Sequence, residues 1–262
     1  MNRSFLIQEF YQFFIVFIRV AGMVITMPAF GQAEIPPRFR AMMAIVIGFS
    51  MTPFLSQNLP SDFSNYMPVA FLMIRELAIG LFIGLVGRTL LGILDVAGSI
   101  ISYQLNLSNA TLFNPSMASQ GVITAMMLSM AGTTLILVLD LHHLMIYAVI
   151  HSYALFPVQA ASAFLADGHS MIGDMAHTLV HIMGRVFVIA VQFSSPFLLV
   201  GIILQLAFGL LNRLVPQMQI FFVAMPLQIG LGLFVLALVI SGMLLSFGEQ
   251  FANEFSLALK LM

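Results

Sequence analysis

Six long apolar segments with few charges make up most of the chain and restrict it to a helical membrane fold. A segment of this kind needs about 20 residues to cross the hydrocarbon core of a bilayer as an α-helix. Only 7% of the residues are charged and 61% are hydrophobic, whereas soluble domains carry about 25% charged residues. We therefore expect an all-α integral membrane protein. The segments are residues 10–30, 41–55, 67–94, 122–150, 183–211 and 214–247.

The lengths of these segments do not fit a plain bundle of six equal spans. Residues 41–55 are short for a span, whereas residues 214–247, if wholly helical, would extend about 50 Å against a hydrocarbon core of about 30 Å. Prolines inside or beside the segments each remove a backbone donor, and freed carbonyls must be satisfied by protein or water. We therefore expect long, partly broken helical hairpins that pack against partner chains or a cavity. The prolines are Pro28, Pro53, Pro157, Pro196 and Pro226.

The composition argues against several classes of function. Basic residues are few and scattered and the formal net charge is -1, so nucleic acid is not an expected partner. The absence of cysteine excludes disulfides, zinc-thiolate sites and iron–sulfur clusters. No Gly-rich phosphate loop, Gly-x-Ser-x-Gly elbow or His-Glu-x-x-His motif occurs, and Asp95 and Asp140 lack the context of paired catalytic carboxylates. We expect no enzymatic activity, no catalytic residue and no cofactor.

Three ionisable residues interrupt the fourth apolar segment: Asp140, His142 and His143, in the sequence VLDLHHLMIY. Ionisable groups at membrane depth are costly, which makes them candidates for a function such as a proton relay. The alternative is that they lie at the membrane interface, or are paired where the helix leaves the lipid. We favour the second interpretation.

A second group of ionisable residues lies in the polar connection 151–181. Asp174, His177 and His181 would share one face of a helix, and two histidines four residues apart can bind a metal. This spacing is not specific, and no fourth ligand is evident. We therefore favour interfacial histidines and expect no metal site.

Small residues at helical spacing occur in the third apolar segment. Gly80 and Gly84 form a Gly-x-x-x-Gly motif, with Gly87 one turn further on, in the stretch that also carries Arg75 and Glu76. Such glycines permit helices to approach closely, although the motif is frequent by chance in Gly-rich apolar sequence. We predict a role in helix packing and not in a pore.

The stretch 102–121, SYQLNLSNATLFNPSMASQG, is polar without a formal charge and lies between long apolar segments. Five amide side chains alternate with apolar ones, and Pro115 forbids a straight continuous helix. A segment of this composition is not a solvated linker, so we expect protein contacts on both sides of it.

The last third of the chain carries a pattern that identifies a family. Residues 205–236 are predicted to form a helix, a tight connection at 212–216 and a return helix. Within them, GLLNR at 209–213, PQM at 216–218, Phe221 and MPL at 225–227 resemble the most recognisable segment of the FliR family of flagellar biosynthetic proteins. Phe113-Asn114-Pro115 and the pair His142-His143 are similar to further family positions, although position 114 is often acidic in the family. The resemblance covers essentially the whole chain.

The resemblance implies a non-enzymatic subunit of the type III protein export gate, similar to a fusion of a FliP-like portion, residues 1–180, with a FliQ-like C-terminal hairpin, residues 181–262. The implied partners are FliP-like and FliQ-like subunits in a helical hetero-oligomer, FlhB-like and FlhA-like export components, and unfolded flagellar subunits as cargo. The implied location is the bacterial inner membrane, in the flagellar basal body. Two alternatives stay open: the homologous gate of a virulence secretion system, and a stand-alone small-solute transporter.

The resemblance also assigns roles to individual residues. The central loop 102–121 takes the position of a plug that closes a narrow path for unfolded chains, with apolar side chains that exclude water and neutral amides that avoid the cost of a desolvated charge. The plug residues are Gln104, Asn106, Leu112, Phe113, Asn114, Pro115 and Met117. The subunit-interface residues are Gly80, Gly84, Arg213, Pro216, Gln217, Phe221 and Pro226.

Overall fold

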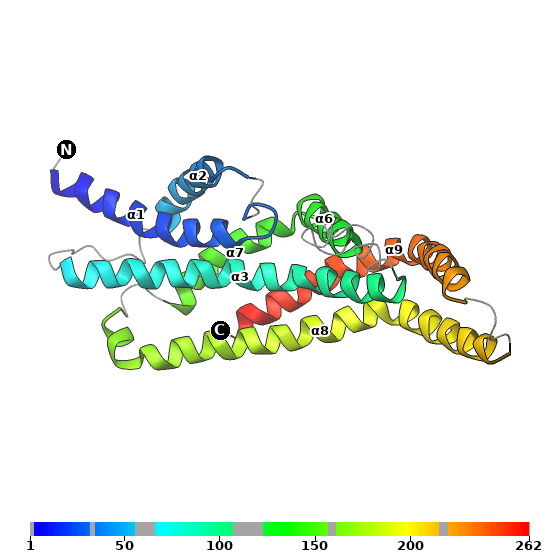
Figure 1. Ribbon diagram of the computed structural model, residues 1–262. Helices are drawn as coiled ribbons and strands as arrows, with labels where there is room; N and C mark the ends of the chain where they lie inside the picture. Colours follow the sequence, from blue (N-terminus) through cyan, green and yellow to red (C-terminus); the bar gives the residue numbers. More distant parts are fainter. Residues whose placement is uncertain are drawn as a thin grey trace. The chain divides into compact units, whose positions relative to one another are not determined.

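The structure is a computed structural model that describes residues 3–31, 35–55, 66–106, 123–156, 161–214 and 220–261. All regular secondary structure in these ranges is α-helical (Figure 1), which confirms the expected all-α class. The helices are α1 (Arg3–Thr26), α2 (Pro37–Leu55), α3 (Tyr66–Gln104), α6 (Ile123–Val138), α7 (Leu141–Leu155), α8 (Ala161–Leu214) and α9 (Ile220–Leu261).

The helices have the length and composition of membrane spans. Five are apolar enough to cross a bilayer alone, and α6 and α7 together form a sixth candidate that is bent by 68°. The expectation of about six apolar segments in an integral membrane protein is thereby confirmed. α8 has 54 residues and α9 has 42, so at about 1.5 Å per residue both exceed a hydrocarbon core of about 30 Å.

Only some of the prolines mark helix breaks: α1 ends at Thr26, two residues before Pro28, and Pro157 lies outside the described residues. Pro53, Pro196 and Pro226 lie inside continuous helices, because one missing amide donor leaves the other hydrogen bonds of a long apolar helix in place. The break between α6 and α7 occurs instead at Asp140, whose φ of 57° places it in the left-handed region. Asp is among the few residues that tolerate this conformation.

Two compact units can be described separately. Unit 1 contains Met1–Leu90, Ile136–Ile182 and Phe251–Met262, and unit 2 contains Leu91–Leu135 and Met183–Gln250. The core of unit 1 is built from fully buried aliphatic and aromatic side chains of α1, α3, α7 and the end of α9; examples are Val20, Ile79, Val149 and Phe255. The core of unit 2 is built in the same way from α3, α6, α8 and α9; examples are Leu94, Leu128, Ala190 and Met243.

Glycines allow α1 and α3 to approach closely within unit 1. A Cβ at Gly22 would lie 2.8 Å from the carbonyl oxygen of Leu77, and a Cβ at Gly80 or Gly84 would overlap with the backbone of α1 or with the side chain of Thr26. Gly80 and Gly84 are therefore buried against α1 of the same chain, and a contact of these glycines with another subunit stays a prediction.

Three hydroxyl side chains in the apolar helices donate to carbonyl oxygens one turn earlier in the same helix. Thr52 donates to the carbonyl oxygen of Gly48, and Thr133 donates to that of Ser129, both at 2.8 Å. Ser194 donates to the carbonyl oxygen of Ala190 at 2.8 Å. Because each bond spans four residues, a carbonyl oxygen of the same helix accepts from each of these hydroxyls at membrane depth.

Candidate functional site

The start of the central loop is the candidate functional site. Residues 102–106 of the stretch 102–121 are described by the structure, whereas Leu112, Phe113, Asn114, Pro115 and Met117 lie outside the described residues. The three residues 104–106 lie at the end of α3, in unit 2, where the central loop begins. Their contacts with α8 and α9 therefore show how the base of the loop is held.

The end of α3 is shaped by Asn106. The amide of Leu105 donates to the carbonyl oxygen of Ile101 at 3.0 Å, and the amide of Asn106 donates to that of Tyr103 at 3.2 Å. Asn106 has a φ of 55°, and asparagine is one of the residues that most readily adopt this left-handed conformation after a helix. The helix α3 thus ends at Gln104, and the left-handed turn at Asn106 allows its side chain to contact Gln228 of α9.

Two glycines receive the side chains of this turn. Leu105 is buried and packs against Gly232 of α9, where a Cβ would overlap with the leucine side chain. Gln104 is half-buried and lies against Gly201 of α8, where a Cβ would overlap with its amide group. The absence of a side chain at both positions lets α3 end directly on α8 and α9.

A pair of neutral amides completes the site. The Nδ2 group of Asn106 donates a hydrogen bond to Oε1 of Gln228, which is only 7% exposed in α9. About two turns before the end of α3, Ser194 of α8 shares its hydroxyl hydrogen with the carbonyl oxygen of Ala97 at 3.3 Å. The base of the central loop is thereby held by polar contacts with α9 and by packing against both long helices.

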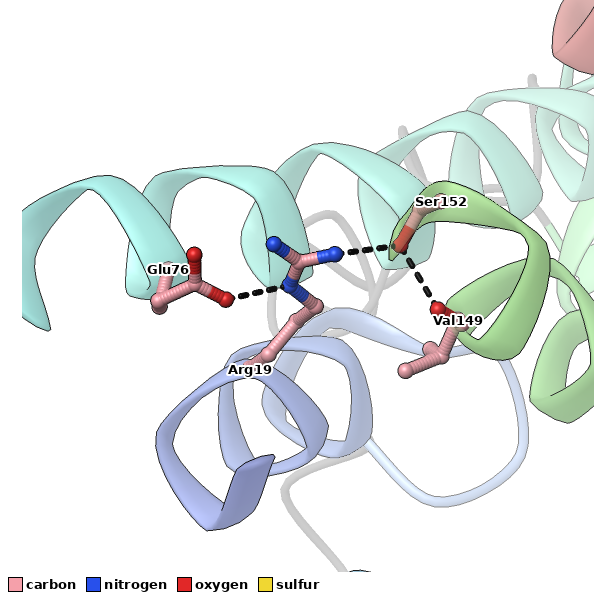
Figure 2. Close-up of polar contacts among 4 residues, drawn as sticks. All are labelled: Arg19, Glu76, Val149 and Ser152. Atoms are coloured by element: carbon pink, nitrogen blue, oxygen red, sulfur yellow. Dashed lines mark hydrogen bonds and ion pairs between the residues drawn. The ribbon is translucent and has the colours of Figure 1, made fainter. Parts of the chain in front are cut away.

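A second polar cluster lies inside unit 1 and is shown in Figure 2. Nε of Arg19 in α1 is 2.5 Å from Oε2 of Glu76 in α3, and both side chains are 0% exposed. Nη1 of Arg19 donates to Oγ of Ser152 at 2.8 Å, and this hydroxyl donates to the carbonyl oxygen of Val149 at 2.7 Å. The guanidinium also lies 3.6 Å from the ring centroid of Tyr153. A buried ion pair with these partners ties α1, α3 and α7 together.

Sequence reasoning missed the partners in both clusters. Arg19 and Glu76 are opposite charges in separate apolar segments, which is a usable signal for an ion pair in a membrane protein. Gln228 is a single amide between apolar residues, but nothing in the sequence connects it to Asn106.

The group Asp140, His142 and His143 lies at the bend between α6 and α7. Oδ1 of Asp140 is 3.4 Å from Nδ1 of His143, and their side chains are 73% and 67% exposed. One potential metal-ligand atom from each of the three residues lies within 4.8 Å of the other two. Among the described residues, this is the one group of three His, Asp or Glu side chains whose ligand atoms lie so close together. Exposed groups of this kind are common without a metal, and we assign none to them.

The other predicted residues do not form a common site. Asp174, His177 and His181 are exposed on α8, and their ligand atoms do not form a close group among the residues described. Arg213 is exposed in the last turn of α8, and Pro226 is exposed inside α9. Phe221 belongs to α9, while Pro216 and Gln217 lie outside the described residues.

Comparison with known proteins gives matches over nearly the whole chain. The family described as bacterial export proteins, family 1, matches residues 10–254. The flagellar biosynthetic protein FliR of Caulobacter vibrioides is 37% identical over 237 residues, which cover 90% of this chain and 91% of the relative. The FliR proteins of Bacillus subtilis and Escherichia coli are 28% identical over 239 residues and 25% identical over 220 residues. These alignments cover 90% and 84% of this chain, and 88% and 80% of the respective relatives.

Proposed function

Because the chain belongs to the bacterial export proteins, family 1, we propose that it is a non-enzymatic subunit of the gate through which unfolded flagellar subunits leave the cell. In this proposal the chain assembles with FliP-like and FliQ-like subunits in a helical hetero-oligomer. FlhB-like and FlhA-like export components are further partners. The gate lies in the bacterial inner membrane, within the flagellar basal body.

The observation that carries this proposal is the match across residues 10–254, together with a 37% identical relative named for flagellar biosynthesis. The family assignment rests on residues 10–254 of the chain and not on a short motif. It also favours flagellar cargo over the cargo of a virulence system, since the three relatives described above carry flagellar names.

Closure of the gate is proposed to depend on the central loop 102–121. Apolar side chains in a constriction exclude water, and uncharged amides avoid the desolvation cost of a fixed charge. The docking of residues 104–106 on α8 and α9 supports this role, because a loop that seals a path needs a base held in a constant position. The proposed plug residues are Gln104, Asn106, Leu112, Phe113, Asn114, Pro115 and Met117.

The proposed assembly assigns residues 1–180 to a FliP-like portion and residues 181–262 to a FliQ-like hairpin. Large exposed apolar side chains continue along the last turns of α8, among them Leu206, Leu210 and Leu214. Such a surface suits contact with other helices or with lipid. The proposed interface residues are Gly80, Gly84, Arg213, Pro216, Gln217, Phe221 and Pro226.

Co-expression tests the proposed assembly. The chain should be recovered from membranes as a hetero-oligomer when FliP-like and FliQ-like subunits are produced with it, and poorly when it is produced alone. A stable monomer or a symmetric homo-oligomer obtained without these subunits would instead support a stand-alone transporter.

Deletion within residues 106–119 tests the proposed closure. If the loop is a plug, the hetero-oligomer should still assemble and cells should leak K⁺. If the loop only packs two helices, assembly and export should fall together. Intact assembly with an unchanged membrane seal would contradict the plug role.

A further inference from the structure

Arg88 is an exposed arginine in the middle of a long apolar helix. It belongs to the candidate span Ala70–Gln104 of α3, which has 35 residues. A crossing needs about 20 residues, and every window of that length within this span contains Arg88. A charged side chain at such a depth is costly unless it faces another polar group or water. The position of Arg88 therefore requires a compensating group.

Two other arginines of unit 1 show how such a charge is compensated inside the chain. Arg19 is fully buried, and its Nε lies 2.5 Å from Oε2 of Glu76 (Figure 2). Arg75, the residue next to Glu76, is also buried. Arg88 differs from both, because its side chain is exposed and forms no ion pair or hydrogen bond with the residues that the structure describes. Its compensating group has to come from elsewhere.

The side of α3 that carries Arg88 has the spacing of a contact between helices. Five exposed or partly exposed positions of unit 1 recur at alternating intervals of four and three residues, and we call them the α3 stripe: Ile74, Ala78, Leu81, Leu85 and Arg88. Ile74 is 66% exposed and Leu85 is 39% exposed, whereas Ile79 and Ile83 of the same helix are buried in the core of unit 1. Alternation of four and three residues is the spacing of the seam between two helices that supercoil around each other.

The charge of Arg88 decides what can cover the α3 stripe. Its apolar positions suit lipid as well as another helix, because lipid tails are as apolar as leucine. A guanidinium that faces lipid tails is costly, whereas one that pairs with a carboxylate is stabilised by charge-assisted hydrogen bonds. A wall of a water-filled path would carry further polar side chains, but the other four positions of the stripe are apolar. The stripe therefore fits a helix that places an opposite charge against Arg88.

From these observations we propose that the α3 stripe docks a membrane helix of another subunit, and that this helix carries an aspartate or glutamate whose carboxylate pairs with Arg88. Arginine suits this contact, because its planar fork of donors matches a carboxylate and is weakly hydrated. The partner helix presents apolar or small side chains to Leu85 and Ala78. The inference rests on the proposed function, since the partner is a subunit of the proposed hetero-oligomer.

Substitutions of Arg88 test the charge in the co-expressed hetero-oligomer. The measurement is the amount of each partner subunit recovered per tagged chain after detergent extraction. Arg88→Lys keeps the positive charge, so recovery should stay within about threefold of the wild type. Arg88→Met leaves the partner carboxylate unpaired, and recovery should fall on the order of tenfold. Arg88→Glu places a like charge against this carboxylate and should lower recovery further.

Contact with lipid predicts the opposite result for Arg88→Met, because removing a charge from lipid is favourable. Unchanged or increased recovery of the partner subunits with Arg88→Met would therefore overturn the proposal.

A matched control and a compensating change separate pairing from general damage. Arg38 is exposed in the first turn of α2, at the end of its candidate span, where its side chain can reach water. Arg38→Glu should leave recovery unchanged, and a loss as large as that of Arg88→Glu would overturn the proposal. In the Arg88→Glu chain, acidic residues in apolar segments of the co-expressed subunits are then changed to lysine one at a time. One of these changes should restore recovery, and failure of all of them would overturn the pairing with a carboxylate.

A photocrosslink identifies what covers the α3 stripe. Leu85→p-benzoylphenylalanine places a photoreactive side chain on the stripe, three residues before Arg88. Irradiation of membranes should join the chain to one of the tagged co-expressed subunits. Adducts only with lipid, with a second copy of this chain or within the chain itself would overturn the proposal.

The wild-type chain distinguishes failure of this inference from failure of the proposed function. If the wild type recovers the partner subunits and every Arg88 variant recovers them equally, the docking of the α3 stripe alone is wrong. If the wild type recovers no partner subunit, the proposed assembly fails and the inference fails with it.

Discussion

Replacing Glu76 with glutamine should strongly destabilise the packing of α1 on α3. The substitution changes side-chain volume little and removes the counter-charge of Arg19, which lies 2.5 Å away with both side chains 0% exposed. Breaking a buried ion pair from one side costs about 3–5 kcal/mol, because the remaining charge stays desolvated. Arg75, also buried, adds a second positive charge next to the site. A glutamine oxygen can still accept a hydrogen bond from Arg19, so we expect a loss near the lower limit, about 3 kcal/mol.

This loss can be measured as a melting temperature of the co-expressed hetero-oligomer in detergent. About 3 kcal/mol corresponds to a decrease on the order of 10 °C for a chain of this size. The chain contains no tryptophan, so its intrinsic fluorescence is a poor reporter, and the fraction of tagged chain that stays soluble after heating is the better signal. Glu249→Gln removes an exposed carboxylate from α9 and should change stability by less than about 0.5 kcal/mol.

The double variant Arg19→Met with Glu76→Leu makes the test sharper. Replacing both members of a buried ion pair by apolar side chains is often neutral or stabilising, so the double variant should be more stable than Glu76→Gln. The role assigned to the ion pair is refuted if Glu76→Gln has the same melting temperature as the Glu249→Gln control. It is also refuted if the double variant has the lowest melting temperature of these three variants.

Three further substitutions have defined outcomes. Gly80→Ala should reduce recovery of the hetero-oligomer after detergent extraction, because a Cβ there would overlap with the carbonyl oxygen of Arg19. The control Gly92→Ala should be neutral or slightly stabilising, because there is open space around Gly92. Gly232→Ala should raise K⁺ efflux in cells, because a Cβ would displace Leu105 from α9; efflux equal to wild type would contradict the docking of the loop base. Asp140→Leu should reduce the free energy of unfolding by about 1–2 kcal/mol and lower the melting temperature, because leucine does not tolerate the left-handed backbone. Asp140→Gly should not lower it, because glycine tolerates this conformation.

The fold class could be predicted from the sequence because one requirement dominates it: the backbone of a long apolar segment must form its hydrogen bonds internally when it lies in lipid. Long apolar segments with few charges can satisfy their backbone in lipid only as helices or closed barrels, and segments near 20 residues favour helices. The family could also be predicted, since the pattern around 209–227 is specific, and the match over residues 10–254 confirms it.

The helix break and the polar contacts could not be predicted, because they depend on tertiary structure. Proline content indicated breaks at Pro196 and Pro226, yet both lie inside helices, and the break occurs at an aspartate. The sequence shows that Arg19 interrupts an apolar run, but its pairing with Glu76 depends on how closely α1 approaches α3. The partner of Asn106 lies 122 residues away along the chain, a separation at which no local pattern carries information.

The bend at Asp140 has a consequence for the orientation of the whole C-terminal part in the membrane. α6 and α7 have only 16 and 15 residues, fewer than the roughly 20 that a span requires, so neither crosses the bilayer alone. If the bent pair crosses as one span, the described helices form six candidate spans, and if it enters and returns on the same side they form five. An even number places the start of α1 and the end of α9 on the same side of the membrane, and an odd number places them on opposite sides. The course that the bent pair takes through the bilayer therefore decides on which side of the membrane α8 ends and α9 begins.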